Sequence, residues 1–419
     1  MTTSAILVGL YVPDTVPSPE QRLEELGSLV LAAGAEVVDQ LWQPAARAGV
    51  PRDPATWIGK GKVEEVAERV QELGAKMAVF DSELSPAQIR NLEKGLGCRV
   101  LDRSELILDI FAGRARTRAA VLQVELAQLE YTAPRLRGMW THLERQAGSS
   151  GGFVGSRGPG EKQIEIDRRI VGKRVARLKE EIAGIEARAA RTVQSRSDFT
   201  VGLVGYTNAG KTTLMDALTG DGDGGEDALF ATLDTRSRKW HVDGMDVVLS
   251  DTVGFVRDLP HHLVASFRAT LEEAVHADLR LHVIDASHPL AVDQARAVRA
   301  VLAELDCDPE QTLPVINKAD VADPDAVGTL LREADGGIVV SAVSGQGIEE
   351  LEAEVVRRAR ADWVRLSVDA GAGDGKLRAF LHEHGRVREE SFDDADWHAE
   401  VELPRRWMGE YRKLVEAAG

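Results

Sequence analysis

The stretch FTVGLVGYTNAGKTTLMDAL, residues 199–218, predicts the fold of the central part of the chain. It reads as an apolar strand, a loop from Gly205 to Thr212, and an amphipathic helix. The loop matches the pattern Gly-x4-Gly-Lys-Ser/Thr of a phosphate-binding loop, whose backbone N–H groups surround the β-phosphate of a nucleotide. We therefore expect Lys211 to reach the β- and γ-phosphate oxygens and the Thr212 hydroxyl to bind Mg2+.

This match is specific. A Gly-x4-Gly-Lys-Ser/Thr pattern arises by chance in roughly one chain of this length per hundred, and the strand–loop–helix context makes a chance match rarer still. The residues that we assign to nucleotide contact here are Gly205, Tyr206, Thr207, Asn208, Ala209, Gly210, Lys211, Thr212 and Thr213.

A second motif, DTVGF at residues 251–255, follows the apolar run Val247-Val248-Leu249. We expect Asp251 to hold Mg2+ through water and the Gly254 N–H to bind the γ-phosphate. In GTPases of the Ras and Gα type, the next residue is a glutamine that orients the attacking water. Here it is Phe255, whose side chain can neither donate nor accept a hydrogen bond, so we expect its ring to turn away from the nucleotide and intrinsic hydrolysis to be slow.

Two further motifs predict a guanine base. LPVINKAD at residues 313–320 supplies Asn317, Lys318 and Asp320 at the end of a predicted strand. The Asp320 carboxylate can accept from the N1–H and the exocyclic amine of guanine, a donor pattern that adenine lacks. IVVSAVSGQG at residues 338–347 places Ser341 and Ala342 at another strand end, where the Ala342 N–H can meet guanine O6.

A switch loop is expected between the phosphate loop and Asp251, in LFATLDTRSR at residues 229–238. We assign Thr232 to Mg2+ and the γ-phosphate, with Thr235 as the alternative, and Phe230 and Ala231 to nucleotide contact. The preceding GDGDGGED, residues 220–227, lacks the terminal bidentate glutamate of a calcium loop. The metal ligands are thus predicted to be Thr212, Thr232 and Asp251, and the catalytic groups Lys211, Thr232 and Gly254.

Composition fits a soluble globular protein: of the 419 residues, 43% are hydrophobic and 28% are charged. No apolar run approaches the ~18 residues of a membrane-spanning helix. The start, MTTSAILVGLYVPD, lacks the positive segment of a signal peptide, and the two cysteines fit a reducing compartment. We therefore place the protein in the cytoplasm and leave open a peripheral association with a membrane.

Alternating strand and helix patterns predict an α/β multidomain protein. We expect a parallel α/β domain over residues 1–112, an antiparallel helical arm over 113–197, a GTP-binding domain with a mostly parallel sheet over 198–361, and a small α+β domain over 362–419.

The arm stands out by its charge. Residues 113–198 contain 17 Lys and Arg against 10 Asp and Glu, so this segment carries +7 while the whole chain carries −17. Two apolar stripes indicate paired helices, and the segment between them, from Arg135 to Glu161, includes a glycine-rich basic loop at 148–160. We interpret the loop as a probe into RNA, with a plain surface linker as the alternative.

Four segments outside the nucleotide motifs resemble the HflX family: WIGKGKVEEV (57–66), RSELILDIFAGRARTRAAVLQVELAQLEY (103–131), LRGMWTHLERQ (136–146) and GSRGPGEKQIEIDRRI (155–170). The resemblance covers residues 1–365. It implies a translation-factor-related P-loop GTPase that binds the large ribosomal subunit and its rRNA through the arm loop and the N-terminal domain, and that splits stalled ribosomes under stress. The sequence departs from the family at Trp140, Phe153 and Lys162.

Three functions remain open at this point. The first is a ribosome-associated GTPase that binds GTP and GDP with Mg2+; the sequence leaves its oligomeric state open, and we favour a monomer. The second is a guanine-nucleotide-controlled clamp on RNA or the ribosome with little hydrolysis. The third is an ATP-driven RNA remodeller that works from the N-terminal domain, where Lys60 and Lys62 stand at a helix start.

Overall fold

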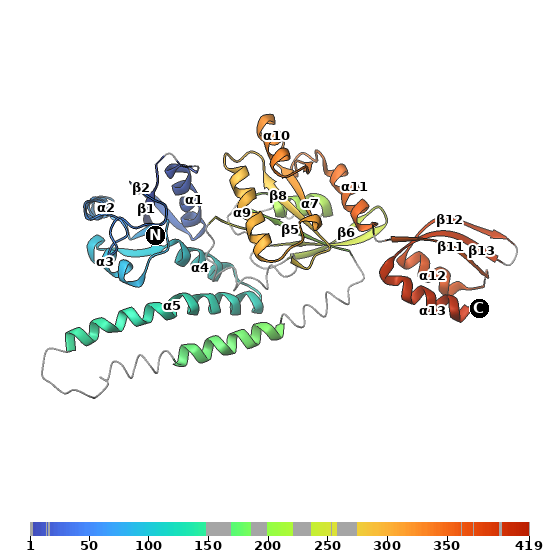
Figure 1. Cartoon of the computed structure of the whole chain (residues 1–419), viewed down its shortest axis with the longest axis horizontal. Helices are drawn as coiled ribbons and strands as arrows, with labels where there is room; N and C mark the ends of the chain where they lie inside the picture. Colours follow the sequence, from blue (N-terminus) through green and yellow to red (C-terminus); the bar gives the residue numbers. More distant parts are fainter. Residues whose placement is uncertain are drawn as a thin grey trace.

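The computed structural model describes residues 3–13, 15, 17–147, 169–185, 199–220, 236–252, 254–257, 275–361, 363–371, 373–393 and 396–418. Three β-sheets follow one another along the long axis of the molecule, and a helical arm runs beside the first two (Figure 1). This confirms the predicted α/β multidomain fold class. The arm loop 148–160 and the predicted switch residues Phe230, Ala231 and Thr232 lie outside the described residues.

The N-terminal sheet has four parallel strands in the order β2-β1-β3-β4. They are β1 (Thr3–Tyr11), β2 (Ala35–Pro44), β3 (Met77–Phe80) and β4 (Arg99–Asp102). Alternate residues of β1 serve two cores: Ala5, Leu7 and Tyr11 join one cluster, and Ile6, Val8 and Leu10 join the other. Both faces of the sheet are therefore covered, as is usual for parallel strands.

Four helices cover these two faces: α1 (Pro19–Ala32), α2 (Lys60–Leu73), α3 (Pro86–Leu96) and α4 (Arg103–Arg114). Helices α1 and α4 contribute to the first core, and α2 and α3 to the second. Ser18 and Ser85 form capping boxes with the glutamines three residues later, and a proline follows each serine in the first turn. Pro86 therefore stands at the first position of its helix.

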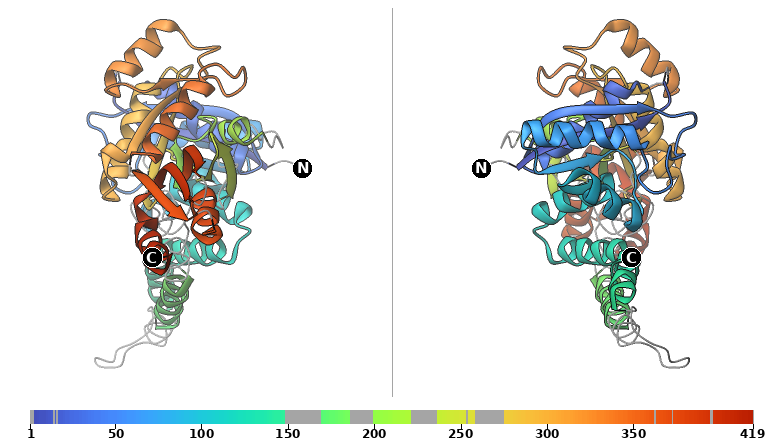
Figure 2. Two further views of the ribbon diagram at one scale, coloured as in Figure 1. Left: turned by 90° about the vertical axis from the view of Figure 1, so that its right-hand side faces the viewer. Right: turned by 90° about the vertical axis from the view of Figure 1, so that its left-hand side faces the viewer.

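The arm contains α5 (Arg118–Ala147) and a second helix over residues 169–185, which lie side by side and project from the α/β body (Figure 2). Arg118 pairs with Glu181 at 3.6 Å, and Glu125, further along α5, pairs with Arg174, earlier in the second helix, at 2.7 Å. The two helices are therefore antiparallel. Their seam contains Leu122, Leu126, Leu178 and Ile182. This confirms the predicted pairing.

One expectation about the arm was wrong. We placed residues 135–147 in the segment between the two helices, but α5 continues through them to Ala147. These residues include arginine, leucine, methionine and glutamate, which favour helix, and only one glycine. Local propensity therefore carries the helix beyond Pro134.

The central sheet has six strands in the order β10-β9-β8-β5-β7-β6, and only the edge strand β6 is antiparallel. Its elements are β5 (Phe199–Gly205), α7 (Lys211–Thr219), β6 (Arg236–Val242), β7 (Met245–Asp251), β8 (Leu279–Asp285), α9 (Ala291–Glu304), η1 (Pro309–Gln311), β9 (Thr312–Asn317), α10 (Pro324–Glu333), β10 (Ile338–Val339) and α11 (Ile348–Ala359). Because the parallel strands end at one edge of the sheet, the loops that follow them meet there, as in other open α/β sheets that bind ligands.

The C-terminal sheet is antiparallel, in the order β11-β13-β12. It is built from β11 (Trp363–Gly371), β12 (Arg386–Asp393) and β13 (Asp396–Pro404), with α12 (Gly375–His384), η2 (Arg405–Trp407) and α13 (Met408–Ala418). Trp397, Val401 and Leu381 lie at the centre of its core. This is the small α+β unit expected from the sequence.

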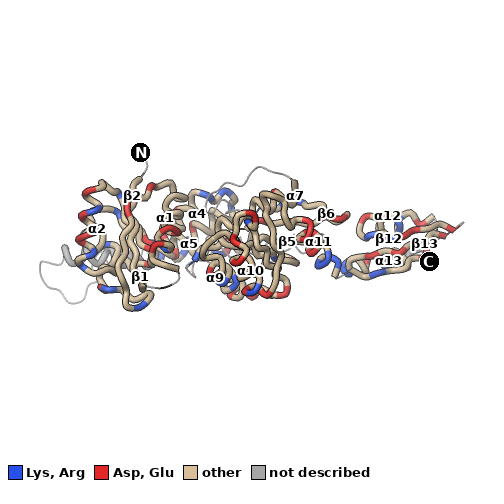
Figure 3. The backbone as a smooth tube through the Cα atoms, turned by 90° about the horizontal axis from the view of Figure 1, so that it is seen from above, with Lys and Arg blue, Asp and Glu red and all other residues tan. Residues whose placement is uncertain are grey.

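Asp and Glu residues occur along the whole described length of the molecule (Figure 3), consistent with the net charge of −17. Among the described residues, no helix is long and apolar enough to cross a membrane.

Candidate nucleotide-binding site

The phosphate loop connects β5 to α7 and requires glycine at both ends of its motif. A Cβ on Gly205 would lie 2.3 Å from the carbonyl oxygen of Val283, closer than any side chain tolerates. Gly210 has φ 89°, and a Cβ there would lie 2.4 Å from Nδ2 of Asn317. The two glycines of the pattern are therefore set by the approach of β8 and β9.

Lys211 begins α7 and is 7% exposed. Its ammonium donates to the carbonyl oxygens of Tyr206 (2.9 Å) and Gly205 (3.3 Å), within the curve of the loop. Burial lowers the pKa of Lys211 to about 8, although the negative charge of Asp251 opposes this shift. A bound phosphate would favour the positively charged form of Lys211, which burial disfavours.

Thr212 and Asp251 meet although they are 39 residues apart. The Thr212 hydroxyl donates to Oδ2 of Asp251 at 2.7 Å, and Asp251 is fully buried at the end of β7. A hydroxyl and a carboxylate beside the phosphate loop are the oxygen donors that Mg2+ prefers. These residues fit a magnesium ion, and the neighbouring Thr213 is half-buried in the same helix turn.

Gly254 lies directly against the phosphate loop. A Cβ there would stand 2.8 Å from Cα of Thr207 and 3.1 Å from Nζ of Lys211. The contact is held by two backbone hydrogen bonds, from Phe255 N–H to Gly205 O (3.0 Å) and from Thr207 N–H to Phe255 O (2.8 Å). The Asp-x-x-Gly loop is thus hydrogen-bonded to the phosphate loop like a short parallel strand.

The predicted base-reading residues follow β9. The Asp320 carboxylate is exposed and makes no hydrogen bond or ion pair with a residue that the structure describes, so its oxygens are available to a base. Lys318 pairs with Asp285 at the end of β8, with 2.7 Å between Nζ and Oδ2. Asn208 is exposed on the phosphate loop, with φ 61°.

Asn317 joins the phosphate loop to the loop that follows β10. Its Nδ2 donates to Ala209 O at 2.9 Å, and its Oδ1 accepts from Ala342 N–H at 3.1 Å. The side chain of Ser341 is also engaged, because its hydroxyl oxygen accepts from Ser344 N–H at 3.1 Å. The Ala342 N–H that we assigned to guanine O6 therefore has a partner within the protein, and a contact with guanine requires sharing or exchanging that bond.

Phe255 points into the protein core. The ring is 3% exposed and belongs to a cluster that also contains Leu26 and Phe111 of the N-terminal domain. Val256 and Leu302 of the central domain join the same cluster. The residue that replaces the usual glutamine thus forms part of a core shared by two domains.

Tyr206 belongs to the phosphate loop, but its side chain lies in the domain interface. The phenol is 5% exposed, donates to Oε1 of Glu25 (2.9 Å) and accepts from Arg257 N–H (2.6 Å). Burial, and then the charge of Glu25, raise the pKa of Tyr206, so the phenol stays protonated. Only the backbone of Tyr206 remains for the nucleotide contact that we predicted.

Sequence reasoning missed the charged groups that complete this interface. The guanidinium of Arg103 is 4% exposed and binds Asp81 (2.7 Å), Glu25 (2.5 Å) and the carbonyl of Arg257 (2.9 Å). Burial alone would lower the pKa of Arg103, but the two carboxylates raise it. Glu25 also pairs with the Arg257 side chain at 2.9 Å. None of these residues belongs to a nucleotide motif, so only the structure reveals their role.

The lysines that we considered for a second nucleotide lie at the start of α2. Lys60 opens this helix, and Lys62 pairs with Glu65 at 2.7 Å. Part of the charge that a phosphate would use is therefore neutralised within the helix.

A phosphate loop, an Asp-x-x-Gly loop against it and a base-reading motif, all at one edge of a mostly parallel sheet, define a P-loop GTPase domain. Comparison with known proteins is consistent with this class. Residues 20–112 match the family model described as GTP-binding GTPase N-terminal, residues 114–196 match the GTP-binding GTPase middle region, and residues 200–318 match the 50S ribosome-binding GTPase.

The chain belongs to the HflX family of GTPases. It is 44% identical over 423 residues to the GTPase HflX of Magnetococcus marinus, covering 99% of this chain and 96% of that protein. It is 41% identical over 420 residues to the GTPase HflX of Escherichia coli, covering 98% of this chain and 95% of that protein.

Solved structures resemble the chain less closely. A GTP-binding protein from Sulfolobus solfataricus, solved in complex with GDP, is 24% identical with a TM-score of 0.46, covering 86% of this chain and 99% of that one. That likeness is too loose to bear on function.

Proposed function

We propose that this protein is a GTPase that binds the large ribosomal subunit in its GTP state and splits or rescues stalled ribosomes under stress, in the cytoplasm. The observation that carries the proposal is the burial of Phe255 between two domains. Because that position supplies no group to orient water, hydrolysis needs a surface outside the nucleotide site to order the switches. The match to ribosome-binding GTPases supports the ribosome as that surface.

The geometry of the site supports the nucleotide-binding roles that we propose. Lys211 and the backbone of the phosphate loop hold the β- and γ-phosphates, the Gly254 N–H contacts the γ-phosphate, and Asp320 selects guanine. Mg2+, held by Thr212 and Asp251, would neutralise charge on the phosphates. Thr232 is proposed as the switch ligand.

The Asp-x-x-Gly loop contacts both the phosphate loop and the N-terminal domain. Gly254 is the proposed γ-phosphate contact, and Phe255, the next residue, packs against the N-terminal domain. A shift of this loop on GTP binding would therefore change how the two domains pack. This coupling allows the nucleotide state to control a ribosome-binding surface.

The arm supplies the proposed contact with rRNA. Its segment carries a net charge of +7 in a chain whose net charge is −17, which favours a polyanionic partner.

The test is sedimentation of the full chain with purified large subunits in the presence of a non-hydrolysable GTP analogue or GDP. We expect co-sedimentation with the analogue, weaker binding with GDP, and weaker, less salt-dependent binding when a neutral linker replaces residues 148–160. Unchanged binding by the linker variant would contradict the role of the loop.

A guanine-nucleotide-controlled clamp with little hydrolysis is the second candidate, because the Phe255 side chain is buried in the core and supplies no group to orient water. Multiple-turnover assays with large subunits separate the two functions. Sustained phosphate release identifies a GTPase cycle, whereas tight binding without turnover identifies a clamp.

A further inference from the structure

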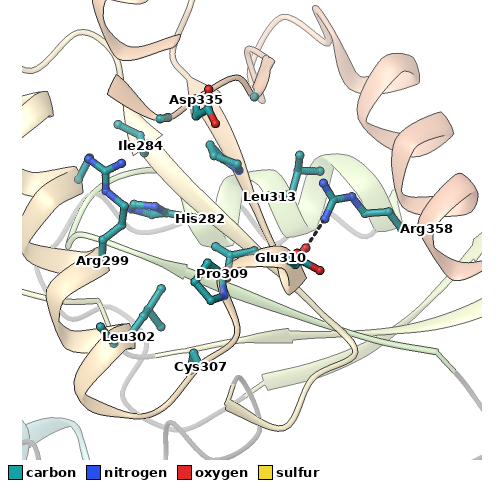
Figure 4. A pocket seen from close by; sticks show the side chains of 16 residues that line it. His282, Ile284, Arg299, Leu302, Cys307, Pro309, Glu310, Leu313, Asp335 and Arg358 are labelled. Atoms are coloured by element: carbon teal, nitrogen blue, oxygen red, sulfur yellow. Dashed lines mark hydrogen bonds between the residues drawn. The ribbon is translucent and has the colours of Figure 1, made fainter. Parts of the chain in front are cut away.

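A cavity of about 500 Å3 lies in the central domain, between β8, β9 and α9, and is bordered by η1, the loop before β10, and α11 (Figure 4). Its size falls within the range of small-molecule sites. None of the residues assigned to nucleotide contact lines it. It is therefore separate from the phosphate and base sites.

The walls of the cavity are mostly apolar. Ile284, Leu302 and Leu313 line it and are each at most 6% exposed. A ligand that fills this space must have an apolar body, because polar atoms would find no partner along these walls.

One buried polar side chain, His282, breaks this apolar lining. The residue is 2% exposed, and its ring makes no hydrogen bond to any residue that the structure describes. Burial, and then the Arg299 cation, lower the pKa of His282 to about 3, so the imidazole is neutral at pH 7. A neutral imidazole has one donor and one acceptor, and no described residue uses either, so both are available to a ligand in the cavity.

Arg299 supplies a positive charge beside that ring, as Figure 4 shows. One of its N–H groups donates to Glu333 O at 2.7 Å, and it has no carboxylate partner among the described residues. The Glu333 carboxylate instead pairs with Arg296 at 2.8 Å. Arg358, on the opposite side of the cavity, is already paired with Glu354 at 2.8 Å. Of the two arginines that line the cavity, Arg299 is therefore the one without a carboxylate partner among the described residues, and its remaining N–H groups are available to a ligand.

The remaining charges limit how much negative charge a ligand can carry. Glu310 and Asp335 also line the cavity, and both are exposed. Two carboxylates at the edge would repel a nucleoside di- or triphosphate, whereas a single anionic group at Arg299 is neutralised there. We propose that this cavity is a binding site for a small organic monocarboxylate with an apolar body, its carboxylate on Arg299 and His282.

The Cys307 thiol can be used to capture ligands covalently in the cavity. It lines the cavity, is half-buried and is one of two cysteines in the chain. The full chain with Cys98→Ser leaves it as the only thiol. Three disulfides of equal length are offered under mild reductant: those of mercaptohexanoic acid, mercaptohexanamide and aminohexanethiol. The Cys307 thiolate attacks one disulfide, a mixed disulfide forms, and the other half leaves as a thiol. Intact mass gives the fraction captured.

We expect the carboxylate compound to be captured about tenfold more strongly than the amine, with the amide between them. Arg299→Leu should abolish this order, and the matched control Arg296→Leu, on the same helix but paired outside the cavity, should keep it. Guanine-nucleotide binding by each variant verifies its fold. Equal capture of all three compounds, including none, would overturn the proposal, as would an order that survives Arg299→Leu. The readout is a mass and does not depend on the proposed ribosomal function.

Discussion

The hydroxyl of Tyr206, within the phosphate loop, donates a 2.9 Å hydrogen bond to Glu25, 181 residues earlier in the chain. The same carboxylate binds both Arg103 and Arg257. With Asp81, these residues form a neutral set of two cations and two carboxylates beside the nucleotide site. The N-terminal domain is thereby attached to the loop that holds the phosphates.

Glu25→Gln should weaken this attachment. The change leaves two arginines with one carboxylate in a poorly hydrated interface, and breaking such a pair costs about 3 kcal/mol. Urea unfolding of the variant should therefore begin at a lower concentration than for the wild type. Glu24, the exposed neighbour of Glu25, provides the control variant Glu24→Gln. If the unfolding curves of the two variants coincide, the network adds nothing to stability.

Phe255→Gln should not accelerate hydrolysis. The side chain at this position points into the shared core rather than toward the nucleotide, so a glutamine there cannot reach the water. Its amide would instead be buried without partners, lowering the free energy of unfolding by about 2 kcal/mol. Single-turnover GTP hydrolysis and thermal unfolding test both effects, with Phe255→Leu as the apolar control. A large rise in the intrinsic rate would contradict the buried placement.

Nucleotide binding should take up a proton at mildly alkaline pH. Burial lowers the pKa of Lys211 to about 8, so near pH 8 about half of the free protein has a neutral amine there. The bound phosphates favour the charged form, which raises this pKa and draws in a proton. Calorimetry of GDP binding at pH 8 in two buffers with different ionisation enthalpies should therefore report uptake of about half a proton. No net uptake would refute the lowered pKa.

Asp320→Asn should change base preference. The variant offers an amide donor where guanine presents donors, while xanthine presents a carbonyl that suits it. We expect GDP affinity to fall roughly a hundredfold and XDP to become the better ligand, measured by competition with a fluorescent nucleotide. Unchanged GDP affinity would show that another residue reads the base.

Much of this fold was predictable because its signals are local. Gly205 and Gly210 belong to one continuous phosphate-loop motif, and the apolar stripes at Leu122 and Leu178 specify the paired arm helices. The end of α5 was not predicted, because residues 135–147 were assigned to the segment between the helices, whereas local helix propensity carries α5 through them.

The domain interface was hidden from sequence reasoning for a different reason. Glu25, Arg103 and Arg257 meet only after three distant segments have folded, and a charged residue on a helix normally indicates a solvent-facing position. The departure at Phe255 was visible as a missing glutamine, but its packing partners in α1 and α4 were not.

We propose that a surface outside the nucleotide site, on the large ribosomal subunit, completes hydrolysis. The most direct measurement is the single-turnover GTPase rate of the full chain with and without purified large ribosomal subunits, at saturating GTP and Mg2+. We expect a slow rate without the subunits and a rise of about tenfold or more with them, and we expect Lys211→Ala to abolish this rise. An identical rate with and without large subunits would show that they do not complete the site.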